Sequence, residues 1–306
     1  MENTGSRVLI ETVVKKSIQE AKVDPERQVR KIVDFALEHS NTQNKKHFFQ
    51  VAHDMLKQEN CPYYVLLKDT ISYVDADRIL KFGMNLGYNS CVYGMKQLHE
   101  KEQEQHTWLP WMIPFKVNDD FISHMESIKK VIEEGKKTGI YTYAFDVGEY
   151  FDVVVPFIQD NEDCAFFLIC DSNKITTKFL DELAYLKNIM VVLAYNEQEQ
   201  GIRELRDMGI PYSIYLKYSQ ADLENIQNGD FFMSAQQASP FFTFLIPSDD
   251  CLQSVQEKVY NCVIEARNKG LYHTIPFEFM KDSSLIDLAI SDGLYSHTNV
   301  DYYSFK

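Results

Sequence analysis

The sequence predicts an α/β protein in which an all-helical N-terminal region precedes a partial (βα)6-type, TIM-like barrel. Apolar residues recur with a helical period from residue 8 to about residue 100. Beyond Pro110, short apolar runs of strand length alternate with amphipathic helices, which is typical of parallel βαβ units. We therefore expect three parts: a helical region at 1–107, the partial barrel at 108–293 and an aromatic C-terminal tail at 294–306.

Composition restricts the class of protein. The net charge of −14 disfavours nucleic acid as a partner, because neutralising phosphates requires clustered Lys and Arg. The first residues lack the basic and apolar pattern of a signal peptide, and no apolar run approaches the roughly 18 residues of a membrane span. The six cysteines are scattered without a C-x-x-C pair and are expected to be reduced thiols, most of them filling the core. We expect a cytoplasmic protein that binds neither nucleic acid nor membrane.

The helical region shows several start signals. Asp24 and Pro25 open a helix whose apolar stripe includes Val29 and Val33, because Asp can cap free N–H groups and Pro loses no bond there. Further helices are expected at 45–58, after Pro62 and from about residue 74. The last one carries Gly83 and Gly87, which we interpret as positions of close backbone packing.

A metal site near the end of this region is an alternative interpretation. His99, Glu100, Glu104 and His106 are all potential ligands. Their run is rich in Glu and Gln, which is typical of a solvated helix end and linker. We therefore expect no metal there.

The βα repeats can be placed by their apolar runs. Strands are expected at 112–117, 140–145, 165–170, 189–194, 212–218 and 241–246, with a small seventh at 274–279. A helix follows each strand, and right-handed crossovers make a barrel or an open half-barrel the natural product.

Binding and catalysis in such barrels take place at the carboxyl ends of the strands. The polar residues expected there include Lys116, Asp146, Glu149, Tyr195, Asn196, Lys217 and Glu278. Each of them alone is also a common loop residue or helix cap. Together they leave open an enzyme that uses the carboxylates for acid–base chemistry and a lysine as an electrostatic clamp.

Several stretches in fixed order resemble the radical SAM superfamily. They are the Pro-Trp strand at 110–116, the segment EGKKTGIYTY at 134–143, Gly148-Glu149, DCAFFL at 163–168 and ITTKFLDEL at 175–183. The similarity covers most of residues 20–290 and is greatest to a bacterial subgroup with an N-terminal helical region. The resemblance implies a partial βα barrel.

Active members of that superfamily carry C-x-x-x-C-x-x-C in the loop after the first strand. The three thiolates hold a [4Fe–4S] cluster that binds and reduces S-adenosylmethionine. This chain has no cysteine between Cys91 and Cys164, and Val117 to Phe121 runs almost directly into the helix. The loop itself is therefore expected to be missing, and no [4Fe–4S] cluster is expected.

Two further family elements are only partly present. A Gly-Gly-Glu-Pro element that normally contacts the methionine part of the cofactor reads Val147-Gly148-Glu149-Tyr150, and we expect no residual S-adenosylmethionine binding. Tyr195 and Asn196 are a loose match to the polar position near the ribose. The ligand-binding candidates are thus Lys116, Asp146, Gly148, Glu149, Tyr195, Asn196, Lys217 and Glu278.

The resemblance therefore implies a degenerate radical SAM-like pseudoenzyme. Its function would be that of a binding, accessory or regulatory protein for a small molecule, a peptide or a catalytically competent relative. The alternative is a barrel enzyme with replaced, non-radical chemistry, a hydrolase or a transferase, which uses the carboxylates at the strand ends.

Overall fold

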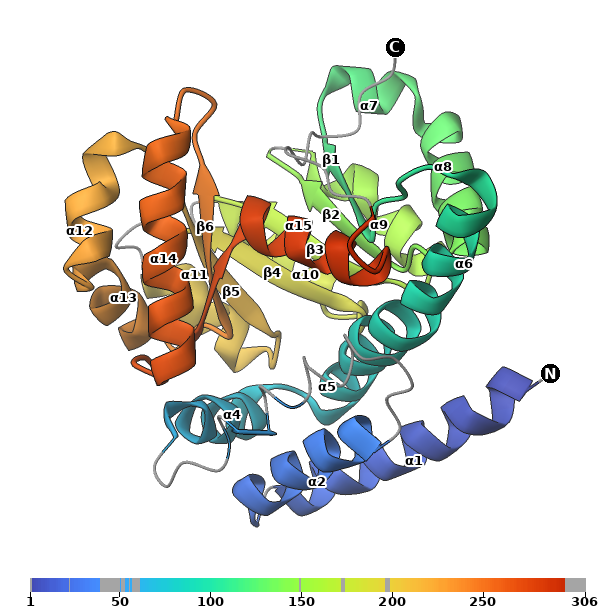
Figure 1. The fold of residues 1–306 in the computed structure, drawn as a ribbon, viewed down its shortest axis with the longest axis horizontal. Coiled ribbons are helices and arrows are strands. Elements are labelled where there is room, and N and C mark those ends of the chain that lie inside the picture. Colours follow the sequence, from blue (N-terminus) through green and yellow to red (C-terminus); the bar gives the residue numbers. More distant parts are fainter. Residues whose placement is uncertain are drawn as a thin grey trace. The chain divides into compact units, whose positions relative to one another are not determined.

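The computed structural model describes residues 2–21, 23–38, 50, 53–54, 56, 61–148, 150–171, 174–195 and 199–294. They form two compact units, each discontinuous in the sequence. Unit 1 contains Met1–Ala76 and Ser213–Lys281, and unit 2 contains Asp77–Tyr212 and Asp282–Lys306. Each unit therefore combines helices of the N-terminal region with βα repeats (Figure 1).

Four parallel strands follow one another in chain order in unit 2. They are β1 (Met112–Lys116), β2 (Thr142–Asp146), β3 (Ala165–Cys170) and β4 (Ile189–Ala194). β3 is buried along its whole length, as expected for an apolar strand in a parallel sheet that is covered on both faces. The predicted parallel βα repeats are confirmed here.

A row of aromatic rings crosses these strands. Phe115, Phe145 and Phe166 stack with centroids 5.6 Å apart at each step. Phe121 meets Phe115 and Phe145 edge-on at 6.0 and 5.9 Å. All four side chains are buried, and both arrangements are favoured geometries for aromatic pairs. This packing holds the helix that contains Phe121 against β1 and β2.

The helices of unit 2 precede β1, connect its strands and follow β4. They are α5 (Ala76–Gly83), η1 (Met84–Gly94), α6 (Met95–Gln105), α7 (Asp119–Ser123), α8 (Met125–Thr138), α9 (Phe151–Asp160), α10 (Thr177–Leu183), α11 (Glu199–Asp207) and the part of α15 (Phe279–Ile290) from Asp282 onward.

The glycine-rich stretch of the helical region differs from its prediction. η1 is a π-helix, and Gly83 and Gly87 are exposed, with nothing within 4 Å of an added Cβ. The interpretation that these two glycines allow close packing is therefore wrong. Gly94, at the end of η1, does allow it, because a Cβ there would collide with the carbonyl oxygen of Gly139. Gly139 itself ends α8 with a φ of 112°.

Unit 1 repeats the βα pattern with three parallel strands. They are β5 (Tyr212–Tyr218), which enters the unit at Ser213, β6 (Phe242–Pro247) and β7 (Ile275–Glu278). Its helices are α1 (Glu2–Ala21), α2 (Pro25–Glu38), α4 (Pro62–Tyr73), η3 (Gln220–Asp222), α12 (Leu223–Gln227), α13 (Asp230–Ala235), η4 (Gln236–Ala238) and α14 (Gln253–Lys269). The strands thus correspond closely to the predicted ones.

Helices and strands share one core in unit 1. Tyr63, Tyr64 and Leu66 of α4 are buried and pack with Phe241 and Ile275 of the βα segment. The N-terminal helices are therefore an integral part of this unit.

Two expected segments lie mostly outside the described residues, and one observed helix was not expected. The helix expected at 45–58 and the tail at 294–306 lie largely outside them. α13 was not predicted; it follows Gly229, whose φ of 81° turns the chain between two short helices.

Candidate functional site

The carboxyl ends of β1 and β2 bring Lys116 and Asp146 together. The two residues are paired in the sheet register, with Lys116 exposed and Asp146 half-buried. The N–H of Val117 donates to the carbonyl oxygen of Asp146 at 2.9 Å, and that of Val147 donates to Ile169 at 3.0 Å. These hydrogen bonds continue the parallel pairing one residue beyond β1 and β2, and so they hold the backbone at this edge of the sheet in place.

The connection from β1 to α7 consists of two residues, Val117 and Asn118. Asn118 is the N-cap of α7, and its side-chain oxygen accepts from the N–H of Phe121 at 3.0 Å. Such a cap ends the loop at once, because it fixes the first turn of the helix. The expected absence of a longer loop after the first strand is confirmed.

The chemistry of the donors does not fit a [4Fe–4S] cluster at this edge. A cluster of this kind needs several thiolates around one centre. Cys164 lies just before β3 and Cys170 is its last residue, and both are buried. Burial raises the pKa of both thiols far above their ordinary value, and nearby aspartates add to the rise. They are therefore core thiols in their protonated form.

The turn after β2 contains three more residues of interest. Gly148 has a φ of 48°, a conformation that favours glycine. Tyr150 is 38% exposed, and its hydroxyl donates to Asp119 Oδ1 at 2.9 Å, which joins this turn to the first turn of α7. Glu149, like Asn196 after β4, lies outside the described residues, whereas Tyr195 is half-buried at the end of β4.

In unit 1 the two remaining candidates have different environments. Lys217 is exposed, and its Nζ lies 3.7 Å from Asp249 Oδ1. Glu278 is fully buried, accepts from the hydroxyl of Tyr218 at 2.8 Å and accepts from the N–H of Lys281 at 2.6 Å. Burial, and then the Glu278 carboxylate, raises the pKa of Tyr218 well above its ordinary value. Glu278 is therefore bound within the core of its unit, and its two oxygens have protein donors.

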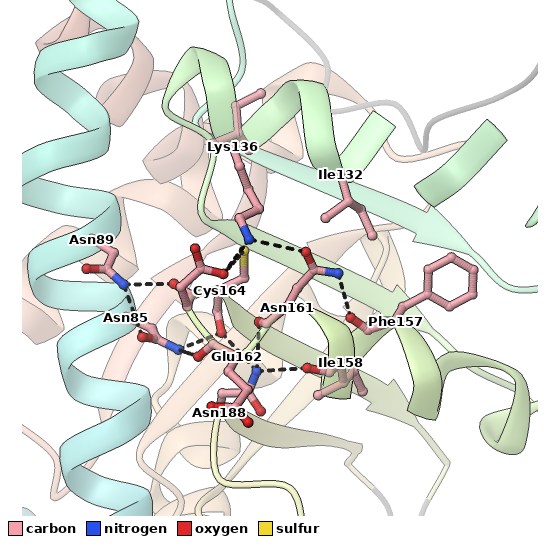
Figure 2. Close-up of polar contacts among 12 residues, drawn as sticks. Asn85, Asn89, Ile132, Lys136, Phe157, Ile158, Asn161, Glu162, Cys164 and Asn188 are labelled. Carbon is pink, nitrogen blue, oxygen red and sulfur yellow. Dashed lines mark hydrogen bonds and ion pairs between the residues drawn. The ribbon is translucent and has the colours of Figure 1, made fainter. Parts of the chain in front are cut away.

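Sequence reasoning missed a cluster of buried asparagines at the opposite, amino-terminal side of unit 2 (Figure 2). Asn85 Nδ2 donates to the carbonyl oxygens of Glu162 and Cys164, each at 2.7 Å. Asn89 Nδ2 donates to the carbonyl of Asp163 at 2.8 Å and to Asn85 Oδ1 at 3.1 Å. The three carbonyl acceptors, of Glu162, Asp163 and Cys164, belong to the turn that leads into β3.

The same turn is held from two further elements. Asn188, just before β4, donates from Nδ2 to the carbonyls of Ile158, Asn161 and Cys164 at 3.2–3.3 Å. Lys136 of α8 pairs with Asp163 Oδ1 at 2.6 Å (Figure 2). Because buried carbonyls require donors, this cluster is best explained as the fixation of the β3 lead-in.

Asn85 and Asn89 are four residues apart in η1, so their side chains lie on one face of the helix and contact each other. Bonding from i to i+5 places residues five apart on one face of η1. Asn85 and Ser90 are so spaced, as are Asn89 and Gly94, and all four are buried. Ser90, in the same helix, accepts a hydrogen bond from Thr142 Oγ1 of β2 at 2.8 Å. The sequence shows two asparagines four residues apart in a glycine-rich stretch, but it does not show which distant carbonyls they bind.

Within the described ranges, no group of three or more His, Cys, Asp and Glu side chains is placed to hold a metal ion. None of the helices that the structure describes is long and apolar enough to cross a membrane. Comparison of the chain with protein-family models, curated protein sequences and solved structures gave no match.

Proposed function

We propose that the protein is a radical SAM-like pseudoenzyme without an iron–sulfur cluster, which acts as a binding or accessory protein. Its ligand would be a small molecule, a peptide or a catalytically competent relative. The observation that carries the proposal is the two-residue connection between β1 and α7, closed by the Asn118 cap. That connection replaces the loop from which the resembled family holds its cluster.

The thiol chemistry supports the same conclusion. Iron is bound by thiolates, so a ligand must lose its proton easily. Burial instead raises the pKa of Cys164 and Cys170, the cysteines nearest in sequence after the strand. Neither is suited to replace the missing loop.

The geometry gives less support to the alternative function, a hydrolase or transferase that uses the strand-end carboxylates as general acid and base. A general acid or base must reach the substrate by a hydrogen bond. Glu278 is fully buried with donors on both oxygens, and Lys217 faces Asp249 at the surface. Lys116, which is exposed, and Asp146, which is half-buried, lie side by side at the carboxyl ends of β1 and β2.

Anaerobic reconstitution with iron and sulfide tests the proposal. We expect a colourless protein with no stoichiometric iron and no cluster absorbance. A C164S/C170S double variant is the matched control, because it removes the two core thiols and should give the same result. A brown wild-type preparation that cleaves S-adenosylmethionine would overturn the proposal.

Calorimetry tests the ligand-binding part separately. We expect no heat of binding with S-adenosylmethionine, because half of the Gly-Gly-Glu-Pro element is replaced and Tyr150 turns toward α7. Saturable binding of that cofactor, lost in a G148V variant, would show that the family's ligand site persists.

A further inference from the structure

The part of α15 that lies in unit 2 has polar residues inside and part of its apolar surface outside. Its buried residues, together with the one that follows the helix, are Asp282, Ser283, Asp287, Ile290 and Ser291. By contrast, Leu285 is 48% exposed, and Ala289 is exposed. A helix at a protein surface usually shows the opposite distribution, with its apolar residues toward the core. The outward apolar residues of α15 therefore call for a cover.

Polar contacts determine which side of α15 faces the interior of unit 2. The N–H of Trp111, just before β1, donates to Asp287 Oδ1 at 3.4 Å. His99 of α6 binds the carbonyl oxygen of Ile290 through Nδ1 at 2.7 Å. Leu285 lies two residues before Asp287, and residues so spaced lie on nearly opposite sides of a helix. Rotation of α15 to bury Leu285 would therefore break the contacts with two other elements of the unit.

The apolar side of α15 consists of Leu285, Leu288 and Ala289. Their spacing of i, i+3 and i+4 places them next to one another on the helix surface. Leu288 is half-buried, so the described residues cover both leucines only in part. A stripe with this spacing is typical of a helix that packs against another segment.

α15 ends in a turn that redirects the chain. Asp292 and Gly293 have positive φ angles of 52° and 86°, and the N–H of Gly293 donates to the carbonyl oxygen of Leu288 at 2.8 Å. Such a turn ends a helix and leads the chain away from the helix axis. Leu294, which is 64% exposed, is the last residue that the structure describes. Residues 295–306 therefore begin close to the apolar side of α15.

The composition and length of residues 295–306 match this surface. Their apolar and aromatic residues are Tyr295, Val300, Tyr302, Tyr303 and Phe305, and their Lys and Asp residues are Asp301 and Lys306. Fully extended, the segment spans up to about 40 Å, whereas a helix from Asp282 to Ile290 is about 14 Å long. Because the segment is joined to α15 by the chain, its effective concentration at this surface exceeds that of a separate molecule.

We propose that residues 295–306 fold back over the apolar side of α15, with their aromatic side chains against Leu285 and Leu288. The segment buries the leucines that α15 turns outward, while α15 keeps its polar contacts with unit 2. A protein partner that uses this side of α15 must first displace the segment. The inference does not depend on the proposed function.

Replacement of an outward leucine tests the contact in the full-length chain. L285K places a charge on the apolar side of α15, and L271K is the matched control, because Leu271 of unit 1 is 49% exposed. Native wild type, L285K and L271K are treated with chymotrypsin, and cleavage after Tyr302, Tyr303 and Phe305 is followed by mass spectrometry. We expect cleavage in L285K to be about tenfold faster or more than in the other two, since burial of one leucine is worth at least that factor. Equal rates in the three proteins would overturn the proposal.

Replacement of the aromatic residues tests the same contact from the other side. In a Y302S/Y303S/F305S variant we expect the amides of residues 285–288 to exchange faster than in the wild type, and those of α14 to be unchanged. Unchanged exchange along α15 would contradict the proposal.

Sedimentation velocity distinguishes the segment from a second copy of the chain as the cover. A wild-type monomer that L285K leaves monomeric supports the segment. A wild-type dimer that L285K dissociates would overturn it.

Discussion

Single residues determine how closely η1 and the end of α8 approach each other. Gly94 leaves room for the carbonyl oxygen of Gly139, and Gly139 has the positive φ that ends α8. Gly87 lies in the same π-helix, but it is exposed and has open space around it. Two glycines of one helix therefore have different physical roles, and substitution can distinguish them.

We expect G94A to destabilise the protein by about 2 kcal/mol or more, because the added methyl group forces two backbones apart. G87A is the matched control and should be neutral or stabilising by about 0.5–1 kcal/mol, since alanine has less backbone entropy to lose. Urea unfolding of the two variants provides the measurement. Equal stabilities would show that the close approach is not a constraint.

The asparagine cluster leads to a second prediction. N85A removes the donor to the carbonyls of Glu162 and Cys164 and should lower the free energy of unfolding by about 2 kcal/mol. N268A, at an exposed position of α14, should change it by less than about 0.5 kcal/mol. Thermal or urea unfolding checks both values, and a neutral N85A would contradict the assigned role.

At the level of elements, the short connection after β1 depends on its cap. Asn118 accepts from Phe121 N, and Phe121 packs its ring against β1 and β2. One side chain therefore links the local start of α7 to the aromatic core. The absence of a longer loop is a property of this junction and not of a single missing ligand.

We expect N118A to lower the free energy of unfolding by about 1 kcal/mol, because the first turn of α7 loses its acceptor. N118G should lose only a few tenths of a kcal/mol, since glycine is a tolerated cap. The comparison is made by urea unfolding. A larger loss for glycine than for alanine would mean that backbone stiffness, and not capping, holds the connection.

At the level of the whole molecule, chemical labelling of buried thiols can measure how easily each unit opens. Cys61 is buried in unit 1, and Cys164 and Cys170 are buried in unit 2. Burial raises the pKa of all three, so the reactive thiolate is scarce in the native protein. Labelling therefore requires opening of the unit that contains the thiol.

We predict that Cys164 and Cys170 label with one opening free energy, because Cys164 directly precedes β3, Cys170 is its last residue, and both become accessible when that strand separates. Cys61 should report a separate opening of unit 1. Mass spectrometry after alkylation at increasing urea concentration measures the three sites. Different opening free energies at the two ends of β3 would contradict the cooperative behaviour of unit 2.

The sequence alone predicts the βα pattern, because the apolar periodicities of strands and helices are carried by neighbouring residues. It predicted β3, β4 and β5 with their observed bounds and the short connection after β1. Which polar residues meet depends on how distant parts of the chain pack in the folded protein. Asn85 binds a carbonyl 77 residues away, and Trp111 binds Asp287 across 176 residues. Such pairs follow from chain packing, and no local pattern of residues reveals them.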